Sequence, residues 1–174
     1  MEYIFETKYD LKVLTMMARI VRKTVRKKHS RRSHVFGWLA VVFGILMLVP
    51  LNGEAVTIDF KKVLTVMAIF VIVCVLLFED LLNGYLAKKR MLPGTDAAVT
   101  RFKDNEFLTE LKMGVTDWKY EYIDLLVETK EYFVFVFGNC HAQLYDKKSL
   151  VGGTVDEFRN FITEKTGKQI LKIK

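Results

Sequence analysis

The sequence has few residues that crosslink chains or bind metals, with 2 cysteines and 3 histidines among 174 residues. Cys74 lies inside an apolar run and Cys140 lies beside a predicted turn, so a disulfide between them is implausible. This placement favours a reducing, cytoplasmic domain. The first 34 residues also lack the apolar stretch and cleavage site of a secretory signal peptide. We therefore expect the apolar segments to remain in the mature protein.

Acidic residues are scarce at the N-terminus. Residues 1–34 hold ten Lys or Arg but only Glu2, Glu6 and Asp10 on the acidic side, and the rest of the chain carries equal numbers of basic and acidic residues. The net charge of +7 therefore lies in the first fifth of the chain. At this length we expect one membrane element and one small globular domain, because two full-sized globular domains would not fit.

Lys, Arg, Asp and Glu are absent between Arg32 and Glu54. A helix of about 20 such residues spans roughly 30 Å, the thickness of a hydrocarbon core. We predict a first membrane span at about 34–51 and a second at about 61–82, within a helix that continues to about residue 90. Residues 33–92 would then form a transmembrane hairpin. The alternative is that both runs are buried helices of a soluble core, although few residues would remain to cover them.

Lys and Arg are concentrated on one side of the predicted hairpin. By the positive-inside rule this distribution places both termini in the cytoplasm of a multi-pass membrane protein. Such residues attract anionic headgroups at about 1 kcal/mol each near the surface. The alternative is that they only determine the topology of the hairpin. A nucleic-acid arm is disfavoured because no stacking aromatics interleave the charges. The predicted membrane-surface residues are Arg22, Lys23, Arg26, Lys27, Lys28, Arg31, Arg32, Lys88, Lys89 and Arg90.

Residues 1–32 are predicted to form a short strand and an amphipathic helix. Met1 to Glu6 alternates weakly between apolar and polar residues, and Thr7 to Asp10 has the spacing of a helix capping box. Apolar residues then recur at steps of three and four, which predicts a single apolar seam along the helix.

From residue 97 onward the hydrophobic period becomes strand-like, with turn residues every six to ten positions. The run 132–137 is apolar at every position, which predicts a strand covered on both faces. The final helix is the obvious cover, because Thr154 and Glu157 have the spacing of a capping box and Gly167 ends its pattern. The predicted strands lie at about 97–102, 106–112, 115–120, 123–129, 132–137 and 141–145.

The segment 118–135, in which Trp118 and Ile123 lead into an apolar strand, resembles the YcxB-like family of bacterial membrane proteins. A proline often follows the last strand in that family, whereas this chain has Tyr145-Asp146-Lys147-Lys148. The resemblance implies an α+β membrane protein with a two-helix transmembrane hairpin. It also implies a small antiparallel domain of pleckstrin-homology type at 97–174, capped by a C-terminal helix, in a bacterial cell membrane.

No motif commits the chain to a reaction. Cys140 and His141 are adjacent strand residues that point to opposite faces, and no second ligand pair has a metal-binding spacing. We therefore predict no catalytic, cofactor-binding or metal-binding residues. Glu79 and Asp80 form either a functional acidic pair or, as we favour, ion pairs with the basic segment.

The leading hypothesis is a non-enzymatic, membrane-anchored binding module that presents a surface to a protein or lipid at the cytoplasmic face, with Lys119, Lys147 and Lys148 on the expected partner-binding surface. A self-immunity protein against a membrane-directed toxin or bacteriocin is the alternative. An enzyme acting on lipids is the third. The sequence does not discriminate among them.

Overall fold

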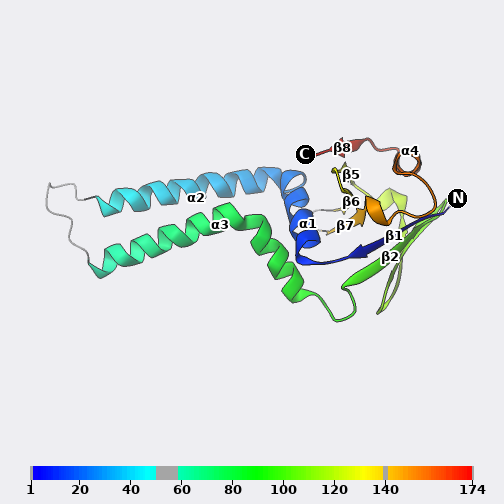
Figure 1. Ribbon diagram of the computed structural model, residues 1–174. Helices are drawn as coiled ribbons and strands as arrows, with labels where there is room; N and C mark the ends of the chain where they lie inside the picture. The colour runs from blue at the N-terminus through cyan, green and yellow to red at the C-terminus, as the bar shows by residue number, and fades with distance from the viewer. Residues whose placement is uncertain (1, 50–58, 139–140, 174) are drawn as a thin grey trace.

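A computed structural model describes residues 2–49, 59–138 and 141–173 of the chain, which has an α+β fold (Figure 1). Two long helices extend to one side, and a β-rich domain lies at their other end. The helices are α1 (Leu11–Lys23), α2 (Lys27–Leu48), α3 (Phe60–Arg90) and α4 (Val155–Thr166).

The strands form two four-stranded sheets. The first has the order β1-β2-β3-β4 and is antiparallel throughout, and the second has the order β7-β6-β5-β8, with β8 parallel to β5. The strands of the first sheet are β1 (Tyr3–Lys8), β2 (Ala97–Phe102), β3 (Glu106–Leu111) and β4 (Gly114–Lys119). Those of the second are β5 (Leu125–Glu128), β6 (Tyr132–Phe137), β7 (His141–Asp146) and β8 (Ile170–Lys172).

The six strands predicted after residue 97 are all present. Two begin and end where predicted, at 97–102 and 132–137, but the strand predicted at 123–129 is shorter because Tyr120–Tyr122 forms a 3-10 turn. The parallel strand β8 was not predicted. Its three residues carry too little pattern to distinguish a strand from a tail.

The predicted capping box at Thr7 was wrong. Thr7 belongs to β1, where its hydroxyl donates to the Leu144 carbonyl oxygen at 2.8 Å. The helix begins one turn later, since the Asp10 carboxylate accepts from the Val13 backbone nitrogen at 2.8 Å. Pairing of β1 with β2 also joins the N-terminus of the chain to the domain that resumes at residue 97.

The central strand β6 is buried on both faces, as predicted. Phe133 and Phe135 face a core between the two sheets, where Phe158 of α4 is packed 5.2 Å from the Phe133 ring centroid. Val134 and Val136 face the other way and belong to a second cluster. The final helix covers only the first face, because the second face is covered by α1 through Val13 and Ile20.

The helices α2 and α3 lie side by side and are long and apolar enough to cross a membrane (Figure 1). Of the most apolar 18-residue window in each, only 6% is buried in α2 and 0% in α3, so this fold does not bury them as core helices. Gly37 and Gly44 let the two helices approach closely, since a Cβ at either position would press on a side chain of α3. The connecting loop lies outside the described residues, apart from Asp59, which caps α3.

The helix α3 ends at Arg90, as predicted, but it is bent. Phe78 has non-helical backbone angles of −110° and 20°, so the helix kinks just before Glu79 and Asp80. Beyond the kink, Gly84 packs against the backbone of Thr15, where an added Cβ would lie 2.8 Å from the Thr15 nitrogen. The absence of a side chain at residue 84 therefore lets α1 dock on α3.

Candidate functional site

The acidic pair at the kink of α3 binds the basic segment, as favoured from the sequence. Asp80 accepts two hydrogen bonds from Arg22, at 2.6 Å from Nε and 2.7 Å from Nη2, and a third from Arg19 at 3.3 Å. Two parallel guanidinium bonds to one carboxylate fix orientation as well as charge. This pairing locks the C-terminal half of α1 onto α3.

Glu79 joins α3 to α2. Its Oε2 atom lies 2.7 Å from His34 Nε2 and accepts a hydrogen bond from the Ser30 hydroxyl at 3.3 Å. Arg22 Nε lies 3.7 Å from the same oxygen. One compact polar cluster therefore holds all three helices together at the base of the hairpin.

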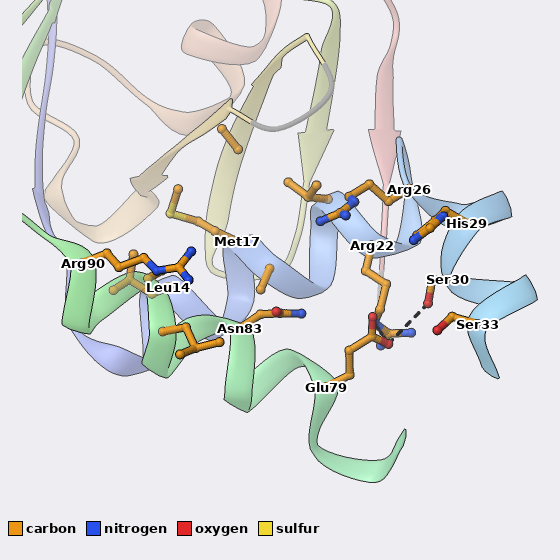
Figure 2. Close-up of a pocket in the computed structure, with 15 residues that line it drawn as sticks. Leu14, Met17, Arg22, Arg26, His29, Ser30, Ser33, Glu79, Asn83 and Arg90 are labelled. Atoms are coloured by element: carbon orange, nitrogen blue, oxygen red, sulfur yellow. Dashed lines mark hydrogen bonds and ion pairs between the residues drawn. The ribbon is translucent and has the colours of Figure 1, made fainter. Parts of the chain in front are cut away.

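A cavity of about 500 Å³ lies beside this cluster, between α1, α2 and α3, and reaches Ala142 of β7 (Figure 2). Its volume is in the range of small-molecule sites. Its apolar lining comes from one face of α1 and one face of α3: Leu14, Met17, Ala18, Val21, Leu86 and Ala87.

Apart from Ala142, the remaining lining is polar, and half of its residues are basic: Arg22, Arg26, His29 and Arg90. Arg26 and His29 lie where α2 begins, and Arg90 ends α3. Among the described residues, none of the three has an acidic partner within ion-pair distance, whereas Arg22 and Glu79 are engaged in the polar cluster. The positive end of the α2 dipole lies at the same place. The cavity therefore carries an excess of uncompensated positive charge.

The other predicted membrane-surface residues lie elsewhere. Arg31 and Arg32 line a separate hollow on α2 with Val35 and Phe36, and Lys88 donates to the Tyr9 carbonyl oxygen at 3.3 Å. The exposed side chains of Lys23, Lys27, Lys28 and Lys89 do not line the cavity. Of the ten predicted residues, the fold brings Arg22, Arg26 and Arg90 into it.

The three lysines of the predicted partner-binding surface have different surroundings. Lys119 and Lys148 are exposed. The side chain of Lys147 is only 14% exposed, and its Nζ lies 2.6 Å from Glu128 Oε1 and 4.9 Å from the Phe133 ring centroid. Lys147 thus points inward, because the turn after β7 places it beside a nearly buried carboxylate.

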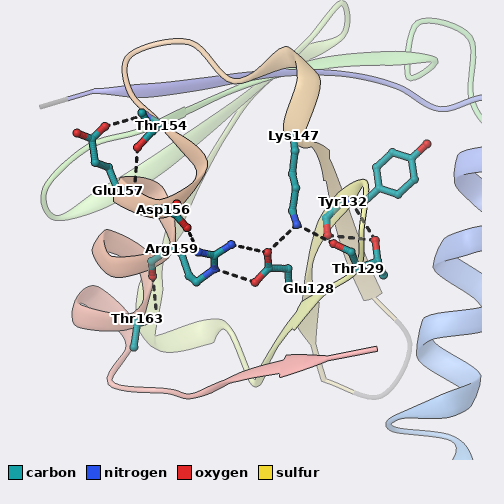
Figure 3. Close-up of polar contacts among 9 residues, drawn as sticks. All are labelled: Glu128, Thr129, Tyr132, Lys147, Thr154, Asp156, Glu157, Arg159 and Thr163. Atoms are coloured by element: carbon teal, nitrogen blue, oxygen red, sulfur yellow. Dashed lines mark hydrogen bonds and ion pairs between the residues drawn. The ribbon is translucent and has the colours of Figure 1, made fainter. Parts of the chain in front are cut away.

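Glu128 is the centre of this second polar network, which joins β5 to α4 (Figure 3). Arg159 donates to both of its oxygens, at 2.9 Å from Nε and 2.7 Å from Nη2. The hydrogen bonds from Arg159, followed by that from Lys147, lower the pKa of Glu128 to about 2. Lys147 and Arg159 are both paired with Glu128, so we assign this network to the stability of the β domain.

The part of the chain that the structure describes contains no group of three His, Cys, Asp or Glu residues able to hold a metal ion. Desolvation lowers the pKa of His141, whose ring stacks on Trp118 at a centroid distance of 5.4 Å. Cys140, its neighbour in the sequence, lies outside the described residues.

Sequence patterns alone did not identify the cavity. Leu14, Ala18 and Val21 were expected only as part of an apolar seam along the helix, and Met17 and Asn83 were not singled out. The one local signal is Asn83-Gly84, a polar and a small residue that interrupt the apolar stripe of α3. A scan against models of known protein families finds no match, and no curated protein is significantly similar to the chain.

Proposed function

We propose that the chain is a non-enzymatic, membrane-anchored binding module that takes an anionic ligand into the cavity between α1, α2 and α3. In this proposal α2 and α3 cross the bilayer, both termini are cytoplasmic, and the β domain lies at the cytoplasmic face. The length and composition of the helices support this arrangement, because α2 and α3 are both long and apolar enough to cross a bilayer. The distribution of Lys and Arg supports the orientation.

We further propose that the β domain is of the pleckstrin-homology type. One sheet formed by β1–β4, a second begun by β5–β7 and a following helix packed on the core between them support this comparison. The hairpin would then be an insertion between the first and second strands. This fold is a scaffold for binding, and its function must be argued from the site.

The observation that carries the proposed function is the uncompensated charge of Arg26 and Arg90 at a cavity that is apolar on its α1 and α3 faces, with the His29 ring beside Arg26. Cationic donors over an apolar lining suit an anion with an apolar part. The polar groups beside the cavity support a binding role over catalysis. Ser30 donates to Glu79, which lies between that hydroxyl and His34, so Ser30 and His34 do not form the direct nucleophile and base pair of a hydrolase.

The helix α1, which lines the cavity, is held against the rest of the molecule on two faces. One of its faces packs on β6 and β7 through Val13 and Ile20, and another packs on α3 at Gly84. The ligand would therefore bind where the hairpin meets the β domain. It would contact α1, the helix that also packs on the second sheet. Such a position suits a module that reports on, or is recruited by, the membrane surface.

The test is photo-crosslinking from Met17, which lines the cavity, in native membranes that contain the full chain. A photoreactive residue at Glu164, exposed on α4, serves as the matched control. We expect Met17 to yield a dominant adduct that Glu164 does not form, with mass spectrometry showing whether it is lipid or protein. Identical adduct patterns at both positions, or none at Met17, would overturn the proposed function.

A further inference from the structure

The cavity has two basic ends. Figure 2 shows Arg90 beside Leu14 at one end, and Arg26 and His29 near Arg22 at the other. Leu14 and Arg22 are eight residues apart on α1, which corresponds to roughly 12 Å along the helix axis. A ligand with two separated anionic groups would engage both ends, whereas one phosphate group would engage only one.

Both ends offer donors suited to phosphate. The guanidinium groups of Arg26 and Arg90 present paired N–H donors that match phosphate geometry, and neither has an acidic partner among the described residues. At the Arg26 end, the His29 ring adds a donor and the first turn of α2 adds the positive end of its dipole.

The lining between the two ends is apolar except for Asn83 of α3 (Figure 2). Leu14, Met17 and Val21 of α1 face Leu86 and Ala87 of α3 across the cavity. A soluble sugar phosphate would leave its hydroxyl groups unpaired against this surface. A glycerol that joins two phosphates has a single hydroxyl group on a short hydrocarbon chain, and Asn83 lines the cavity as a polar partner for that hydroxyl.

The cavity also lies next to the proposed bilayer. Ser30 and Ser33 line it from α2, immediately before the predicted start of the first span at residue 34. A lipid of the inner leaflet would therefore enter laterally, without leaving the membrane. Basic pockets beside membrane helices on the cytoplasmic side are known to hold such headgroups.

We propose that the cavity binds the headgroup of a phospholipid that carries two phosphate groups joined by glycerol. One phosphate is bound by Arg90 and the other by Arg26 and His29, while the glycerol lies over Met17. This inference rests on the proposed function, since the lipid reaches the cavity only if α2 and α3 span the bilayer.

The test uses the full chain in lipid nanodiscs that contain either diphosphatidylglycerol or phosphatidylglycerol at equal total phosphate. After extraction into detergent, native mass spectrometry measures the lipid retained. We expect diphosphatidylglycerol to be retained about tenfold more strongly, which corresponds to about 1.4 kcal/mol. Arg26→Gln and Arg90→Gln should each abolish this preference. Arg31→Gln, a charge-matched change outside the cavity, should preserve it.

Thermal unfolding of each variant provides the folding control. Because Arg26 and Arg90 are exposed, we expect neither substitution to lower the melting temperature. Equal retention of the two lipids would overturn the inference, as would Arg26→Gln and Arg90→Gln variants that behave like Arg31→Gln. Full displacement of lipid by soluble pyrophosphate would also overturn it, by assigning the site to a free bisphosphate. A protein adduct at Met17 without lipid preference would refute this inference while preserving the proposed function.

Discussion

The β domain and the hairpin use similar apolar residues in opposite ways. Phe5 and Phe158 are fully buried in the domain, with ring centroids 4.7 Å apart, whereas Phe36 and Phe70 on the hairpin are 69% and 68% exposed. The domain is held by removal of its aromatic rings from water. The hairpin is held by close contacts at glycines and by one polar cluster at its base. Hydropathy alone therefore does not indicate what an apolar residue contributes.

The sharpest test of this contrast is to remove one ring from each region. Phe158→Ala leaves a cavity among Phe5, Phe102 and Phe133 and should lower the free energy of unfolding of the domain by about 3–5 kcal/mol. Phe70→Ala should change it by less than about 0.5 kcal/mol. Denaturant unfolding of the full chain in mild detergent measures both. Similar losses in the two variants would break the comparison.

The charged network of the domain should make its stability depend on pH. The pKa of Glu128 is about 2 in the fold and 4.5 in the reference state. Because the folded pKa is lowered, the stabilisation is complete above pH 4.5 and is lost as the pH falls toward 2. The pKa shift corresponds to a stabilisation of about 3 kcal/mol. Screening by nearby water lowers the expected contribution to the free energy of unfolding to roughly 2 kcal/mol.

Unfolding free energies measured from pH 6 down to pH 2 would test this dependence, with Glu128→Gln as the matched variant. We expect Glu128→Gln to be less stable at neutral pH, because it leaves Arg159 and Lys147 without their carboxylate. Its stability should also vary less across the acidic range. Parallel pH curves for the two proteins would show that other carboxylates control the transition.

The smallest expected effect concerns the contact between the two regions. Gly84→Ala places a Cβ 2.8 Å from the backbone nitrogen of Thr15 and should weaken the docking of α1 on α3 by about 1.5 kcal/mol. Gly37→Ala meets only the flexible end of Leu76 and should cost less. Limited proteolysis of the segment between α1 and α2 would report the loss of docking. Faster proteolysis of Gly37→Ala than of Gly84→Ala would contradict this prediction.

The sequence predicted those elements whose signals are local. Long uncharged runs predicted two helices of spanning length, continuous apolar character predicted the buried strand β6, and Thr154 with Glu157 predicted a capping box that the structure contains. The boundaries failed where tertiary contacts competed with local patterns. Thr7 has the spacing of a helix cap, yet pairing of β1 with β2 keeps it in a strand.

The site depended much more on long-range packing. The basic residues were evident in the sequence, but spacing did not show that Arg26 and Arg90, which lie 64 positions apart, line one cavity while Lys147 turns inward. Nor did it show that α1 covers β6 on one side and docks at Gly84 on the other.

The sequence by itself determined which segments are apolar, which alternate and where their helices and strands end, because these properties depend on neighbours a few residues away. Only the tertiary structure decided which faces meet. The apolar seam of α1 could be buried against a membrane or against protein. Its place between β6 and α3 follows from contacts with residues at least 58 positions away, and those contacts create the cavity.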